Sequence, residues 1–228
     1  MAMRVFAQSL NVVADLKVCL VKNKTSVPFV TSDDPAILTN RWQLLSKRTK
    51  GHSFGLNSAG DILLLPLSPQ VLCVAYDGDV YSMPHRNGWA DVRHHRDVEA
   101  FNQHQYLNCR ANIFFQDETH GSLVHEQFDR AIPNRPEKRH AIHYAVLDSS
   151  DGDWTRYRVV DRSQADRDQK ALIHSQVIHA TPAIWPRQIS WRPKGRVFTN
   201  DTGLGYVRRA WAESNSGRLF RREPATLD

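Results

Sequence analysis

The chain has 228 residues, of which 41% are hydrophobic and 24% are charged. A chain of this length and composition can bury a core, which excludes wholesale disorder. No apolar run reaches the roughly 18 residues that a membrane-spanning helix needs, and the formal net charge of +6 favours anionic partners without identifying one.

The first half of the chain mixes helical and strand-like patterns. Apolar residues recur at a helical period over residues 4–22, which predicts a helix, and residues 27–31 favour a short strand. Residues 39–60 have a loop-like composition that indicates an exposed excursion. The continuous apolar run at 62–67 favours a strand buried on both faces, with 71–76 as its partner. A long helix, or two in series, is expected within 91–115, where Gly and Pro are absent.

Strand-like patterns dominate the second half. Three runs, 141–147, 155–160 and 172–180, predict strands, and 188–192 and 196–199 add two more. We therefore predict an α+β fold with a helix-flanked small sheet core. The expected division is an α+β core at 1–118, a connecting segment at 119–138 and a β-rich basic extension at 139–228.

Three cysteines, Cys19, Cys73 and Cys109, are widely spaced and form no C-x-x-C pair. This pattern predicts reduced core thiols rather than a disulfide framework. The chain opens on an amphipathic segment rather than on the apolar core of a secretion signal. We therefore expect a cytoplasmic protein with no membrane partner.

The positive charge is concentrated in one segment. Residues 187–222 hold nine basic and two acidic residues, a net of +7, whereas the rest holds 21 basic and 22 acidic. Six aromatic residues between 185 and 220 are interleaved with these cations. Arginine forks match phosphate and aromatic rings can stack on bases, so the segment is a candidate nucleic-acid surface. Stacking within an ordinary β-rich domain and docking on another anionic partner remain open. The candidate contacts are Arg187, Arg192, Lys194, Arg196, Arg208, Arg209 and Arg218.

The chain contains eleven histidines, which are common metal ligands, but no pair of them has a local spacing that would let both bind one metal ion. His94 and His95 are adjacent and flanked by arginines, which repel a cation. The carboxylates of Asp77 and Asp79 fit a hairpin turn better than a metal site. No phosphate-binding glycine loop of the P-loop or dinucleotide type is present, so the sequence predicts neither metal nor cofactor.

The most unusual local feature is the run Ser32-Asp33-Asp34-Pro35 at the end of a predicted strand. Its short polar side chains can cap backbone amides, or its carboxylates can act as acids. The candidate catalytic residues are Asp33, Asp34 and His52, with Ser32, Asn102 and Asn108 as supporting polar groups.

Three features together resemble the bacterial family catalogued as domain of unknown function 4238, over residues 5–118. They are the turn at 29–35, the Pro66-Leu67-Ser68-Pro69 strand end, and a helix carrying Asn102, Asn108 and Ala111. The resemblance is to the later half of the family. It implies bacterial origin and an α+β core, and no established activity. Asp34 replaces the family's usual asparagine. The family's opening His-x-x-Pro-like part is absent, which implies a truncated relative or a second chain that supplies it.

Three functions fit these observations. The leading hypothesis is a nucleic-acid-associated protein, either nuclease-like or a defence effector, in which the arginine segment holds phosphate. The second is a non-enzymatic oligomerisation or protein-interaction module. The third is a small-molecule hydrolase built around the Ser-Asp-Asp-Pro turn.

Overall fold

The computed structural model describes residues 12–49, 52–152, 154–165, 171–201, 205–214 and 219–227. The chain separates into two compact units, one formed by residues 1–135 together with 180–228, and the other by residues 136–179. We call them unit 1 and unit 2. This division differs from the expected one, because the carboxy-terminal segment belongs to unit 1 and not to the strands that precede it. The predicted α+β class is confirmed.

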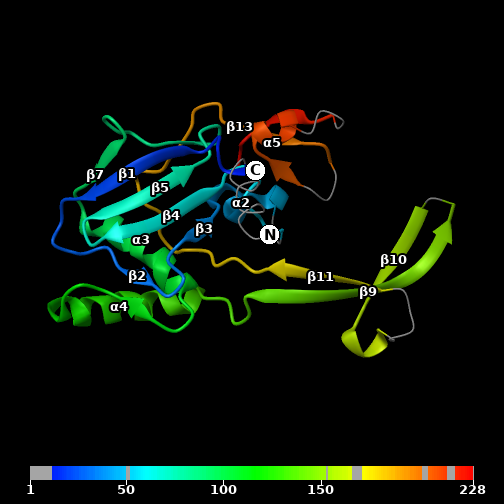
Figure 1. Cartoon of the computed structure of the whole chain (residues 1–228), viewed down its shortest axis with the longest axis horizontal. Coiled ribbons are helices and arrows are strands. Elements are labelled where there is room, and N and C mark those ends of the chain that lie inside the picture. Colours follow the sequence, from blue (N-terminus) through cyan, green and yellow to red (C-terminus); the bar gives the residue numbers. More distant parts are fainter. Residues whose placement is uncertain are drawn as a thin grey trace, which may run out of the picture. The chain divides into compact units, whose positions relative to one another are not determined.

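Unit 1 is built on a five-stranded sheet with the order β3-β4-β5-β1-β7, in which β1 and β7 are parallel and the other neighbours are antiparallel. Helix α3 covers one face of this sheet and α4 packs against α3 (Figure 1). The elements before the second unit are β1 (Lys17–Asn23), β2 (Thr31–Ser32), β3 (Ile37–Thr39), α2 (Arg41–Leu45), the 3₁₀ helix η2 (Lys47–Thr49), β4 (Ile62–Ser68), β5 (Val71–Tyr76), β6 (Tyr81–Ser82), β7 (Trp89–Val92), α3 (His95–Asn108), β8 (Ile113–Phe114), η3 (Glu118–His120), α4 (Gly121–Ala131) and η4 (Ile132–Asn134).

The carboxy-terminal segment completes unit 1 with short elements. Strand β12 pairs with β6, and β13 lies between β14 and β15 in a three-stranded sheet. Val197 and Ile189 of this segment are buried in the same core cluster as the central sheet. The elements are β12 (Ser190–Trp191), β13 (Arg196–Thr199), β14 (Tyr206–Val207), α5 (Arg209–Ser214) and β15 (Arg221–Pro224).

Unit 2 is a three-stranded antiparallel sheet with β9 in the centre. It contains β9 (His140–Asp151), β10 (Trp154–Val160), η5 (Arg162–Gln164) and β11 (Ala171–Val177). The three strands predicted here are confirmed.

Three expectations for the first half were wrong. Residues 17–23 form the strand β1 instead of a helix, because Cys19 and Val21 alternate into the core and partner strands lie on both sides. Of the rest of that expected helix, residues 12–16 form turns rather than an α-helix, and residues 4–11 lie outside the described residues. Strand β4 is not buried on both faces, since Ile62 and Leu64 are buried while Leu67 is 55% exposed.

The expected exposed excursion at 39–60 instead forms part of the core. Trp42 and Ala59 are fully buried. The Asn40 side chain accepts the backbone N–H of Gln43 and donates to the carbonyl of Ala59 at 2.7 Å, so it both begins α2 and fixes the following loop. The expected strand at 27–31 is regular only at its end, where β2 pairs with β8.

The central sheet and α3 supply most of the side chains of the main core cluster. Phe101 of α3 packs edge-to-face against Phe29, which precedes β2. All three cysteines are free, and Cys19 and Cys109 are buried. Within the described residues, no helix has both the length and the apolar character to cross a membrane.

Two carboxyl groups are buried beside the central sheet. Asp61 accepts a hydrogen bond from Asn40 Nδ2 at 3.2 Å on one oxygen, and its Oδ2 has no hydrogen-bond partner. Asp77 accepts the backbone N–H groups of Gly60 and Asp79, both at 2.8 Å. Burial raises the pKa of Asp61 to about 8 and that of Asp77 to about 6. Asp77 therefore lies in the predicted turn, where it accepts the N–H of Asp79, and burial raises the pKa of its carboxyl group.

The raised pKa of Asp61 makes the stability of the fold depend on pH. Above about pH 4 the unfolded carboxyl is ionised, whereas the folded one keeps its proton up to about pH 8. The folded state then binds more protons, so the free energy of unfolding falls as pH rises, at up to about 1.4 kcal/mol per pH unit for this group. Asn at this position carries no proton to lose, so Asp61→Asn is expected to gain stability relative to the native chain between pH 5 and 8, as measured by urea unfolding. Asp129→Asn, at an exposed carboxylate, is the control. A difference between Asp61→Asn and the native chain that stays constant with pH would contradict this account.

Candidate functional site

The turn after β2 is attached to the end of α3 through Asp33. Its carboxylate accepts three backbone N–H groups, from Arg110 at 2.7 Å, Ala111 at 2.8 Å and Asn112 at 3.1 Å. These hydrogen bonds lower the pKa of Asp33. Both of its oxygens are used as acceptors, so Asp33 has a structural role that holds the turn.

Polar side chains of α3 hold the strand that leads to this turn. Asn102, which is 1% exposed, donates to the carbonyl of Pro28 at 2.9 Å and accepts the N–H of Val30 at 3.0 Å. Ser32 donates to Gln105 Oε1 at 2.7 Å. Of the predicted supporting groups, Ser32 and Asn102 thus clamp the segment, whereas Asn108 donates back to its own helix at His104.

Of the other two candidate catalytic residues, Asp34 lies in the same turn as Asp33, and His52 lies elsewhere in unit 1. Asp34 lies 3.6 Å from Arg110 Nε. His52 is exposed in the loop after η2, where its N–H donates to the carbonyl of Thr49 at 3.0 Å. Within the described part of the chain, no hydrogen bond or ion pair joins His52 to Asp33.

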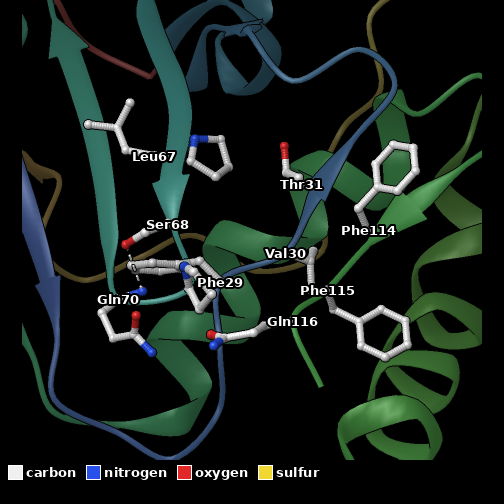
Figure 2. Close-up of a pocket in the computed structure, with 11 residues that line it drawn as sticks. Phe29, Val30, Thr31, Leu67, Ser68, Gln70, Phe114, Phe115 and Gln116 are labelled. Carbon is white, nitrogen blue, oxygen red and sulfur yellow. Dashed lines mark hydrogen bonds between the residues drawn. The ribbon is translucent and has the colours of Figure 1, made fainter. Parts of the chain in front are cut away.

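Two segments that carry the family resemblance meet in an apolar groove. Residues 29–31 approach the end of the β4–β5 hairpin at residues 66–70, and Phe114 and Phe115 lie on the far side of 29–31 (Figure 2). The groove encloses about 470 Å³. Its polar lining consists of amide and hydroxyl groups only, so the side chains supply no general acid or base. The lining residues are Phe29, Val30, Thr31, Pro66, Leu67, Ser68, Pro69, Gln70, Phe114, Phe115 and Gln116.

Most cations of the predicted nucleic-acid surface are engaged with acidic or backbone oxygens. Arg208 is buried and bound to Asp15 at 2.6 Å and to the carbonyls of Val12 and Leu56. Arg209 and Arg192 both approach Asp79, at 2.5 and 3.8 Å.

The other predicted cations are scattered. Lys194 is exposed and has a positive φ of 58°, and Arg196 is half-buried in β13. Arg218 lies outside the described residues. Arg187 binds the carboxylate of Asp97. Arg187 also lines a cleft in unit 1.

That cleft, which we call the arginine cleft, lies where the first turn of α3 meets the carboxy-terminal segment. It encloses about 660 Å³, and Arg41, Arg96, Arg187 and His94 face Asp97 as the only acidic residue of the lining. Asp97 is already neutralised by Arg187, through Nε at 3.0 Å and Nη2 at 2.9 Å. The cleft therefore has an excess of positive charge at the amino-terminal end of a helix, where anions are stabilised.

Asp97 keeps its charge although its side chain is 3% exposed. Burial by itself would raise the pKa of this carboxyl, but the hydrogen bonds from Arg187 and Gln188 outweigh burial and hold the pKa below its usual value. The bidentate geometry fixes the Arg187 guanidinium at the rim of the cleft.

Two tryptophans hold Arg41 at the other side of the cleft. Its guanidinium lies 4.9 Å from the ring centre of Trp191 and 5.6 Å from that of Trp185, and Nη1 donates to the carbonyl of Ile189 at 3.1 Å. Burial lowers the pKa of Arg41. A partly desolvated cation on an aromatic platform gains more from an anion than one in water does.

Several buried polar atoms around Trp185 have no hydrogen-bond partner. They are Arg41 Nε, Trp185 Nε1, His104 Nε2 and Gln188 Oε1. His104 packs edge-on against Trp185, and burial lowers its pKa to about 4, so it is neutral at pH 7. Leaving a buried N–H unpaired is costly, and native sites that do so commonly receive a ligand or water.

Sequence reasoning missed the parts of the arginine cleft that come from the first half of the chain. His94 and Arg96 were noted only as a poor metal motif, and nothing in the local pattern around Arg41 marks it as a site residue. Within the described residues, no group of three His, Cys, Asp or Glu side chains is placed to hold a metal ion.

The fold is that of an α+β protein, and two cavities open on the described part of unit 1. Residues 1–119 match the model of a protein family described as protein of unknown function (DUF4238), and the chain belongs to that family. Comparisons with curated proteins and with solved structures found no match.

The Asn102 clamp gives a test of the motif turn. Asn102→Ala removes both hydrogen bonds and leaves the carbonyl of Pro28 and the N–H of Val30 unpaired in a buried environment. The expected loss is about 2–4 kcal/mol of unfolding free energy, measured by chemical denaturation. Asn112→Ala, at an exposed residue whose backbone alone binds Asp33, is expected to change stability little. Equal losses in the two variants would contradict the clamp.

Proposed function

We propose that the protein binds a nucleic-acid strand, one of whose phosphates enters the arginine cleft. The observation that carries this proposal is the charge of the cleft lining, in which three arginines face one carboxylate that is already paired. The unpartnered Nε of Arg41 and Nε1 of Trp185 support it, because both are donors beside the same cleft. Guanidinium groups match phosphate oxygens in geometry and charge.

The proposal narrows the nucleic-acid hypothesis to a compact contact. Arg208, Arg209 and Arg192 are taken up by Asp15 and Asp79, so a continuous basic surface along residues 187–222 receives no support. Instead, Arg41 and Arg96 come from α2 and from α3 and join Arg187. Since Arg187 is paired with Asp97, Arg41 and Arg96 are the cations of the cleft left for phosphate, and a strand bound mainly through them depends modestly on salt.

Binding of a fluorescently labelled single-stranded oligonucleotide tests the proposal. With about two phosphate contacts, from Arg41 and Arg96, the logarithm of the binding constant should fall with the logarithm of salt concentration at a slope of about −1.4. Arg96→Gln should weaken binding by about tenfold and make the slope shallower by about 0.7.

Arg93→Gln is the matched control, because this neighbouring arginine is exposed, pairs with Asp91 and does not line the cleft. It changes the net charge by the same amount and should leave most of the binding intact. Absence of binding at about 50 mM salt, or equal effects of the two variants, would refute the arginine cleft as the site.

A further inference from the structure

The lining of the arginine cleft carries more positive charge than a single phosphate inside a strand can neutralise. Three arginines and one carboxylate give the lining a formal charge of +2, with His94 counted as neutral. Arg187 and Asp97 neutralise each other at 2.9 Å, so the excess lies on Arg41 and Arg96. A phosphodiester carries one negative charge, whereas a phosphomonoester carries about 1.5 to 2 negative charges at pH 7. The phosphomonoester therefore matches the charge of this cleft.

Two donors beside the cleft are shielded from the solvent. Arg41 Nε and Trp185 Nε1 are both buried and have no hydrogen-bond partner. A phosphate inside a strand is held by the chain on both sides, so it follows the surface over which the strand runs. A terminal phosphate is held on one side only, and it presents three strong acceptor oxygens. Because it can project inward from the strand, it suits donors in this position better than an internal phosphate does.

The rest of the cleft has room for one nucleotide. Its volume of about 660 Å³ falls within the range of about 300–1,000 Å³ that is usual for small-molecule sites. Ala183, Ile184 and Trp185 form an apolar part of the lining, and the Arg41 guanidinium lies 5.6 Å from the ring centre of Trp185. A sugar and a base attached to the phosphate can pack on these side chains, and an aromatic ring suits a base. Inorganic phosphate would leave this apolar part uncovered.

We propose that the arginine cleft receives the terminal phosphate of a nucleic-acid strand, a phosphomonoester, and not a phosphate within the strand. This inference rests on the proposed function and names the part of the strand that the cleft takes. Arg41 and Arg96 bind the phosphate together, while Arg187, held by Asp97, forms the rim. The 5′ and 3′ ends can carry the same group, and the test separates them.

Competition between single-stranded oligonucleotides of one sequence tests the proposal on the full chain. The strands carry a phosphate at the 5′ end, a phosphate at the 3′ end or hydroxyls at both ends, or have their ends joined into a circle. The strand phosphorylated at the preferred end should bind at least about tenfold more tightly than the hydroxyl-ended strand. The circle contains internal phosphates only, so it should bind as weakly as the hydroxyl-ended strand. The thymidine monophosphate of the preferred end should compete with the strand, whereas thymidine should not.

Two arginine variants locate the preference in the cleft. Arg96→Gln removes one of the two uncompensated charges, so it should remove most of the tenfold preference for the phosphorylated end. Arg93→Gln makes the same change of charge at an exposed residue that pairs with Asp91 outside the cleft, and it should keep that preference. The comparison of strand ends uses the native chain and decides without either variant.

The outcomes separate this proposal from the proposed function. If all four strands bind equally and Arg96→Gln still weakens their binding, the terminal-phosphate proposal is overturned and the strand-binding function stands. Absence of binding by every strand refutes both. A phosphoserine peptide carries the same phosphomonoester on another class of macromolecule, and tighter binding of that peptide than of any strand also overturns the proposal.

Discussion

The ion pair between Asp97 and Arg187 joins the two stretches of chain that make up unit 1, residues 1–135 and 180–228. A carboxylate with 3% exposure needs compensation, and Arg187 supplies it with two side-chain hydrogen bonds and one from its backbone N–H at 3.3 Å. Removing one partner of such a pair leaves an uncompensated buried charge. The pair therefore fixes residues 180–228 against α3 and, by the same contact, forms the wall of the arginine cleft.

Other arginines of the carboxy-terminal segment also form ion pairs with acidic residues. Arg208 neutralises Asp15, Arg209 and Arg192 approach Asp79, and Arg221 binds Asp201 and Glu223. A net charge of +7 along a stretch of sequence thus becomes a set of links to acidic residues. The cations left for a ligand include Arg41 and Arg96, which lie more than 80 residues away from that stretch in the sequence.

The elements that depend on short-range sequence patterns were predicted correctly. The β4–β5 hairpin, the strands of unit 2 and the helix within 91–115 follow from periodicity and turn residues. Residues 17–23 were mistaken for helix because a strand paired on both sides, with Cys19 and Val21 inward, resembles a helical stripe in a short window. Burial of Trp42 depends on a contact to Thr226, where its Nε1 donates to the carbonyl at 2.9 Å, and no local pattern reveals a contact over 184 residues.

The candidate site also depends on contacts between residues that are far apart in the sequence. The turn at 32–35 was marked by its own residues, but its role depends on Asn102 and on the N–H groups of 110–112. The carboxylate of Asp33 proved to be an acceptor for backbone rather than a free acid. The arginine cleft is assembled from α2, α3 and the carboxy-terminal segment, so only its parts, and not their convergence, can be read from the sequence.

The central claim is that the unpartnered donors beside Trp185 exist to receive an anion. Side-chain nitrogen NMR observes these donors directly during titration with a thymidine 5′-monophosphate probe. The account predicts that the Nε–H signal of Arg41 and the indole Nε1–H signal of Trp185 shift together and saturate, while the indole signal of Trp42, already bound to Thr226, stays in place. Unchanged Arg41 and Trp185 signals at saturating probe, or shifts spread equally over all tryptophans, would contradict it.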